Sequence, residues 1–128
     1  MIRQNDRQIC LRVKSFNVLK SKGAQYSTKK GKSSVFSYVS NKDDYVVFVA
    51  MDIEKIYDSE FYIVPTHIID KEIKANHSSW IKGTKRNGEL RKLSNHRFLQ
   101  FGTKKSTRRP YGDYCIRWKK YKDNWDFK

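Results

Sequence analysis

Two positively charged side chains share one face of a strand that is predicted near the start of the chain. In the stretch QICLRVKS, residues 8–15, apolar residues occupy positions 9, 11 and 13, and polar or charged residues lie between them. This period of two is typical of a half-buried strand, so Arg12 and Lys14 project to the same side. Such a pair could hold a phosphate, whereas a divalent cation would meet like-charge repulsion and no oxygen ligand.

The carboxylates best spaced for a metal ion are Asp52 and Glu54. They lie two residues apart on one face at the end of a predicted strand, where both could bind one cation. Beside Lys55, solvated charges are the simpler interpretation and the one that we favour. A structural zinc site is not expected, because Cys10 and Cys115 form no CxxC pair.

The chain carries far more positive charge than solubility requires. Its 128 residues include 28 Lys and Arg against 13 Asp and Glu, a formal net charge of +15. A field of this sign attracts polyanions, and nucleic acid is the first candidate. The length fits a single domain over residues 1–128. We see no signal peptide and no apolar run of about 20 residues, so we expect no membrane partner and a cytoplasmic location.

The cations are concentrated in two acid-poor segments, 20–34 and 82–109, which their Gly, Ser and Lys content predicts to be loops. Each could be a solvated surface or could contact phosphates. The lack of compensating acids favours phosphate contact for the first segment, and the two interpretations are equally balanced for the second. The predicted nucleic-acid contacts are Arg12, Lys14, Lys20, Lys22, Lys29, Lys30, Lys32, Lys85, Arg86, Arg91, Lys92, Lys104, Lys105, Arg108 and Arg109.

Between the basic segments, the sequence predicts a sheet core. The apolar runs YVVFV (45–49) and FYIV (61–64) indicate two interior strands. Thr66 is then predicted to cap a helix over HIIDKEIKA (67–75) that packs on the sheet. The stretch SSVFSYVS (33–40) fits helix or strand, and its place between two strands favours a short crossover helix.

The tryptophan and histidine side chains are predicted to serve packing rather than binding. Trp80, Trp118 and Trp125 are expected in the core or between helices and not as platforms for bases. His67 and His77 flank the predicted helix without a neighbouring nucleophile or acid pair, so a helix-surface role is expected for both.

The order of these pieces resembles the C-terminal portion of small bacterial members of the PD-(D/E)xK restriction-endonuclease-like superfamily. The pieces run from Gln8 to Phe127: an xVK strand, a YxVFV strand, FYIVP before a helix, and a terminal YKDNWDF. The resemblance implies an α/β fold with a mixed sheet flanked by helices, and Mg²⁺ held by acids on two successive strands. It also implies that Lys14, two residues after the second acid position, helps to activate water for phosphodiester hydrolysis.

The sequence departs from this family at the metal ligands. Arg12 occupies the position of the second acid, and MIRQNDR leaves too little room for the strand that carries the first acid. We therefore expect a restriction-endonuclease-like core that lacks its first helix and strand.

Three functions fit this picture. The first is a nucleic-acid-binding domain that is not catalytic by itself and binds DNA rather than RNA. The second is a metal-dependent DNA endonuclease, split or truncated, whose missing strand comes from a partner subunit; Mg²⁺ and a catalytic Lys14 belong to this case alone. The third is a basic ribosome-associated or RNA-associated protein.

Overall fold

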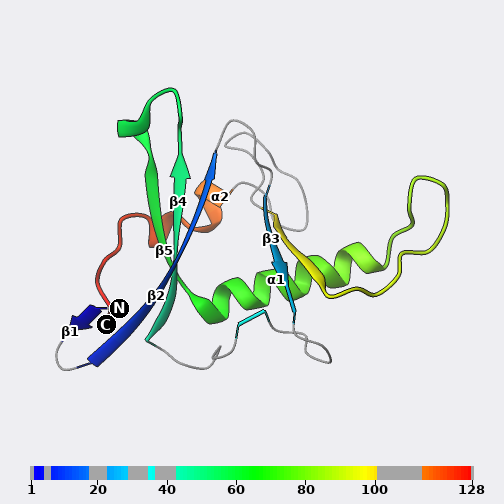
Figure 1. Cartoon of the computed structure of the whole chain (residues 1–128), viewed down its shortest axis with the longest axis horizontal. Helices are drawn as coiled ribbons and strands as arrows, with labels where there is room; N and C mark the ends of the chain where they lie inside the picture. The colour runs from blue at the N-terminus through cyan, green and yellow to red at the C-terminus, as the bar shows by residue number, and fades with distance from the viewer. Residues whose placement is uncertain are drawn as a thin grey trace.

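The computed structural model describes residues 2–4, 7–17, 23–28, 35–36, 43–100 and 114–127, with residues 2–4 described by backbone alone. These residues form a small mixed α+β fold (Figure 1). Its strands are β1 (Ile2–Gln4), β2 (Arg7–Asn17), β3 (Gly23–Ser27), β4 (Asp44–Met51), β5 (Glu60–Pro65) and β6 (His96–Gln100). Its helices are α1 (Thr66–Ile81) and α2 (Tyr114–Arg117), and its short 3-10 turns are η1 (Ile56–Asp58) and η2 (Lys119–Tyr121).

The main sheet has the strand order β1-β2-β4-β5 and is mixed, as predicted. β2 and β4 run parallel, while β4 and β5 form an antiparallel pair. A parallel pair needs a crossover connection. Of the crossover helix expected over 33–40, Val35 and Phe36 are described and form a bend, and its other residues lie outside the described part of the chain.

Among the described strands β5 lies at the edge of this sheet, with an isolated bridge between Tyr62 and Lys122 on its outer side, so the prediction of an interior strand at 61–64 is wrong. Its apolar residues are buried because both faces are covered by other segments. Tyr62 packs with Trp118 in one cluster, and Ile63 packs with Phe127 in another. A continuous apolar run reports burial on two faces, and it cannot distinguish a central strand from a covered edge strand.

A short strand precedes β2, in the stretch MIRQNDR, which was expected to be too short for the strand carrying the first acid. β1 pairs antiparallel with the start of β2, with Ile2 opposite Ile9 and Gln4 opposite Arg7. None of its three residues is acidic. β1 therefore does not supply the first metal-binding acid that the family resemblance implies, and the expected lack of the family's first helix and strand stays a prediction.

A second, two-stranded sheet pairs β3 with β6, and both strands lie inside the segments predicted as basic loops. The loop prediction is therefore wrong at 23–27 and 96–100. Gly23 permits the close pairing, because a Cβ there would lie 2.3 Å from the carbonyl oxygen of Leu99. Each strand has only five residues and lies among lysine-rich stretches, so no alternating pattern identified it as a strand.

Helix α1 connects the two sheets. Ile69 and Ile73, both fully buried, pack against the main sheet as predicted. Further along, the Asn76 amide nitrogen donates to the carbonyl oxygen of Phe98 in β6, at 2.6 Å. The helix begins at Thr66 itself without a side-chain cap, so the predicted capping role is wrong, and it extends to Ile81.

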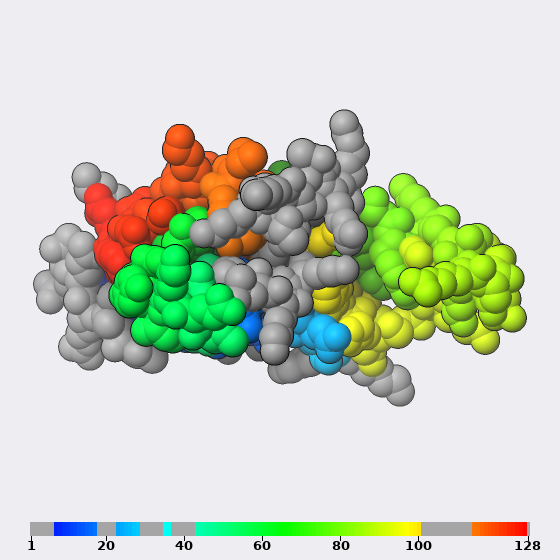
Figure 2. Space-filling model, turned by 90° about the horizontal axis from the view of Figure 1, so that it is seen from above, coloured from blue at the N-terminus to red at the C-terminus, as the bar shows by residue number. Residues whose placement is uncertain are grey.

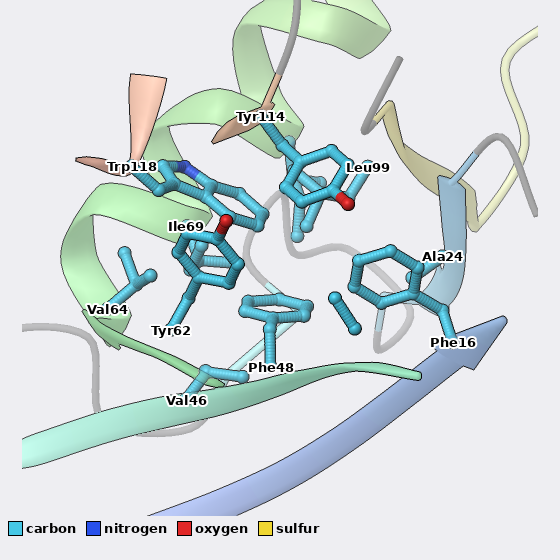
Figure 3. Packing of buried hydrophobic residues seen from close by; sticks show 12 residues of the cluster. Phe16, Ala24, Val46, Phe48, Tyr62, Val64, Ile69, Leu99, Tyr114 and Trp118 are labelled. Atoms are coloured by element: carbon cyan, nitrogen blue, oxygen red, sulfur yellow. The ribbon is translucent and has the colours of Figure 1, made fainter. Parts of the chain in front are cut away.

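The core between the main sheet and the helices is largely aromatic (Figure 3). Phe48 and Trp118 stack with ring centroids 4.9 Å apart, and Tyr62 meets Tyr114 edge to face at 5.6 Å. Trp118 is 1% exposed, which confirms its predicted place in the core. Its indole nitrogen donates to the buried carboxylate of Glu72 at 3.2 Å, so α1 is tied to the C-terminal segment.

Candidate nucleic-acid interface

Arg12 and Lys14 lie on the inner face of β2, where both side chains are partly exposed. Phe16 belongs to the same face and is buried in the aromatic core, whereas Val13 on the opposite face is 69% exposed. The alternation of β2 was therefore predicted correctly, but its outer and inner sides were reversed over 12–16. The residues that pair with these two charged side chains on the inner face belong to other strands.

The partner of Arg12 is Asp44, a carboxylate that is 2% exposed at the start of β4. The guanidinium donates to Asp44 Oδ1 and lies 5.5 Å from the ring centroid of Phe36. The hydroxyl of Thr66 donates to the same carboxylate oxygen at 3.2 Å. The expectation of no acid near Arg12 is wrong, and this acid links β2, β4 and α1 rather than facing an open site.

Lys14 reaches from the main sheet to β3. Its Nζ lies 4.9 Å from the ring centroid of Tyr26 and 3.5 Å from the carbonyl oxygen of Gln25, to which it donates. Burial raises the pKa of Tyr26 to about 12, so the ring stays a neutral cation–π partner at physiological pH. This geometry gives Lys14 a structural role, and its catalytic role stays a prediction.

Asp52 and Glu54 do not share a strand face, because β4 ends at Met51. Asp52 Oδ1 accepts the backbone N–H of Glu54 at 3.1 Å and that of Lys55 at 3.2 Å, and so closes the turn after β4. Among the residues that the structure describes, no three His, Cys, Asp or Glu side chains are grouped as metal ligands. A Mg²⁺ site here stays a prediction without a geometric basis.

A hairpin follows α1, and we call residues 82–92 the basic hairpin. Thr84 and Leu90 form a bridge, and the N–H of Gly88 donates to the carbonyl oxygen of Lys85 at 3.0 Å. The N–H of Lys85 in turn donates to the carbonyl oxygen of Glu89 at 2.8 Å. Gly88 has φ +84°, the left-handed conformation that this kind of tight turn requires and that glycine adopts at no steric cost.

The basic hairpin concentrates positive charge on a protrusion. It projects from the end of α1 as a lobe at one end of the molecule (Figure 2). Its single acid, Glu89, lies 3.8 Å from Lys85 in an exposed pair, which contributes little. Its five cations, all at least partly exposed, are Lys82, Lys85, Arg86, Arg91 and Lys92.

The structure thus brings four predicted phosphate contacts together on one element, namely Lys85, Arg86, Arg91 and Lys92. Arg12 and Lys14 lie apart from them, between the sheets. The remaining predicted contacts fall outside the described residues; they are Lys20, Lys22, Lys29, Lys30, Lys32, Lys104, Lys105, Arg108 and Arg109.

A pocket of about 360 Å³ opens between α1 and β6, beside the basic hairpin. This volume is in the range of small-ligand sites, roughly 300–1,000 Å³. The described residues that line it are Asn76, His77, Trp80, Ser94, His96, Phe98 and Gln100. This site was not predicted from the sequence. Its signal was the alternation of His96, Phe98 and Gln100, which places three side chains on one face of β6.

Trp80 lines this pocket and is 45% exposed, so its predicted place in the core or between helices is wrong. The Arg91 guanidinium lies 4.8 Å from the Trp80 ring centroid and donates to the Trp80 carbonyl oxygen at 2.5 Å. The imidazole of His77 stacks against the indole, with ring centroids 5.8 Å apart and planes at 28°. Trp125 is also half exposed, although it packs on Phe61 with centroids 6.3 Å apart.

His77 was expected on the open helix surface, but the structure places it in the pocket wall. Its Nε2 is buried and has no hydrogen-bond partner within the described part of the chain. Burial lowers the pKa of His77 below its ordinary value, and the positive charge of Arg97 lowers it further. Arg97 is itself held in place, donating to the carbonyl oxygens of Ser94 at 2.5 Å and His96 at 3.0 Å.

The depressed pKa of His77 predicts a loss of stability in acid. Above the ordinary histidine pKa of about 6.5 the imidazole is neutral in both states and costs nothing. As the pH falls below that value, the unfolded chain takes up a proton that the folded protein resists. Urea denaturation at about pH 7.5 and about pH 5.5 should therefore show a larger fall in unfolding free energy for the parent than for His77→Gln. Equal falls would contradict this assignment.

A scan against models of known protein families, a search of curated proteins and a search of solved structures each gave no match to this chain. The proposed function therefore depends on the residues of this chain and their geometry. The structure also holds, over its described ranges, no helix of the length and apolarity needed to cross a bilayer.

Proposed function

We propose that this chain is a nucleic-acid-binding domain that holds phosphates on its basic hairpin and does not hydrolyse them by itself. The observation that carries this proposal is the hairpin, which sets five cations against one acid on a projecting element. Lysine and arginine on such an element release counterions condensed on the nucleic acid, and this release supplies most of the binding free energy.

The shape of the basic hairpin favours DNA over RNA. The major groove of B-form DNA, about 12 Å wide, admits an element as wide as a two-stranded ribbon, and this hairpin is closed by a single bridge between Thr84 and Leu90. The major groove of A-form RNA is too narrow and deep for side chains to read. Arg86 and Asn87 stand at the tip of the turn, and both are exposed. These are side chains that contact phosphates and base edges.

We propose no hydrolysis by this chain alone because, among the residues that the structure describes, the inner face of β2 has no open carboxylate. Asp44 is buried, and the oxygen that faces Arg12 already accepts from that residue and from Thr66. A divalent ion would have to displace the guanidinium to reach it. Nicking of supercoiled plasmid by the pure protein in Mg²⁺ would contradict this part of the proposal.

We also propose that the main sheet derives from a restriction-endonuclease-like core. Three features support this ancestry: Lys14 on β2, the parallel pairing of β2 with β4, and the terminal segment that packs back on the sheet through Phe127. This ancestry explains why a domain that lacks the metal ligands would still bind nucleic acid, since fold and activity are separable.

Site-specific crosslinking tests where the nucleic acid lies. A photoreactive benzoylphenylalanine in place of Leu90, which is 77% exposed on the basic hairpin, should form adducts with duplex DNA. The same substitution at Tyr57, 84% exposed at the β4–β5 connection, is the matched control and should form few. Equal yields at both positions, or adducts at Tyr57 alone, would place the nucleic acid elsewhere.

A further inference from the structure

We infer that the pocket between α1 and β6 binds one unpaired nucleobase of the strand whose phosphates lie on the basic hairpin. This inference rests on the proposed function and adds to it the form of nucleic acid that the domain prefers. A single-stranded segment, or a base turned out of a duplex, would bind more tightly than an intact duplex because it alone can fill the pocket.

The pocket has the chemistry of a base site. Trp80 and His77 present stacked rings at its wall, and Phe98 adds a third aromatic side chain from β6. Stacking on aromatic side chains is the main way in which proteins bind unpaired bases, and it tolerates any sequence because every base has a π face. The cavity of about 360 Å³ is small and lies between two elements, so it suits one base rather than a base pair.

The aromatic wall is organised before binding. Arg91 contacts the indole of Trp80 through a cation–π interaction, and its donation to the Trp80 carbonyl oxygen fixes the last turn of α1. Asn76 commits its amide nitrogen to the Phe98 carbonyl oxygen, which fixes the distance between helix and strand. A wall that is already ordered costs less conformational entropy when a base enters.

The same arrangement connects the pocket to the phosphate-binding surface. Arg91 belongs to the basic hairpin and also contacts Trp80 in the pocket wall, so this hairpin cation lies directly beside the pocket. Gln100 and Ser94 add an amide and a hydroxyl to the pocket wall, groups that can bond the polar edge of a base. A strand that follows the hairpin therefore brings its bases past the pocket.

The test compares two oligonucleotides with the same charge. One is a single strand of about twelve thymidines, and the other is the same backbone with abasic positions in place of the bases. The parent protein should bind the thymidine strand about five- to a hundredfold more tightly, the range expected for stacking of one base. Trp80→Ala should remove this difference without weakening binding to the abasic strand, and Trp80→Phe should retain most of it.

Trp125→Ala is the matched control, because Trp125 is equally exposed but packs on Phe61 away from the pocket. It should leave the preference for bases unchanged. If the parent binds both strands equally tightly, the base pocket is wrong while phosphate binding stands. The same holds if Trp80→Ala weakens both strands alike. If the parent binds neither strand but binds a duplex, the base pocket is wrong; if it binds no DNA at all, the proposed function itself is wrong.

Discussion

Removing three cations of the basic hairpin, in the variant Lys85→Ala/Arg86→Ala/Lys92→Ala, is expected to weaken binding to duplex DNA by roughly 500-fold at about 0.1 M salt. Each phosphate contact changes the logarithm of the affinity by about 0.9 per decade of salt. Relative to about 1 M salt, where such a contact contributes little, one contact therefore raises the affinity about eightfold at about 0.1 M. All three side chains are exposed, so the fold should not suffer from their loss. Fluorescence anisotropy with a labelled duplex measures the effect directly.

A variant with the same charge change elsewhere separates local contact from the general field. Lys55, Lys71 and Lys119 are exposed and lie outside the basic hairpin. Their joint replacement by alanine lowers the net charge equally and should cost far less affinity, since distant exposed charges are screened over about 10 Å. If both triple variants weaken binding alike, the net charge binds the nucleic acid and the hairpin has no special part in it.

The second large effect concerns stability. Replacing Arg12 with methionine removes the guanidinium that lies over the Phe36 ring and leaves the carboxylate of Asp44 buried without its cation. Breaking a buried ion pair from one side typically costs about 3–5 kcal/mol. Since the Arg12 side chain is 35% exposed, water can partly replace it, and we expect a loss of about 2–3 kcal/mol in urea denaturation.

The double variant Arg12→Met/Asp44→Asn provides the control. An asparagine keeps an oxygen that can accept from the Thr66 hydroxyl and removes the buried negative charge. The double variant should therefore be more stable than Arg12→Met alone, although it carries one more substitution. An Arg12→Met protein as stable as the parent would show that Asp44 does not depend on the arginine.

The local elements of this fold could be predicted where one stretch of sequence contains its own signal. The run YVVFV became the central strand β4, and Ile69 and Ile73 of α1 lie on the buried face that their spacing indicates. In β2 the alternation was clear, but which side faces inward depends on Asp44, 32 residues from Arg12. No local pattern contains that information.

The second sheet and the pocket could not be predicted for the same physical reason. β3 and β6 are each five residues long and are stabilised by pairing across about seventy residues of chain. The pocket then arises where β6 passes α1, so Trp80 and Phe98 meet through tertiary contact alone. The turn of the basic hairpin has a local signal in the sequence, since the pair Asn87-Gly88 is typical of tight turns.

The salt dependence of duplex binding tests the central claim most directly. Anisotropy titrations of the parent and of the Lys85→Ala/Arg86→Ala/Lys92→Ala variant over about 50–300 mM salt give the slope of log affinity against log salt concentration for each. If the three hairpin cations each neutralise one phosphate, the variant slope should be shallower by about 2.7. Identical slopes, or a parent affinity that does not fall with salt, would contradict the account.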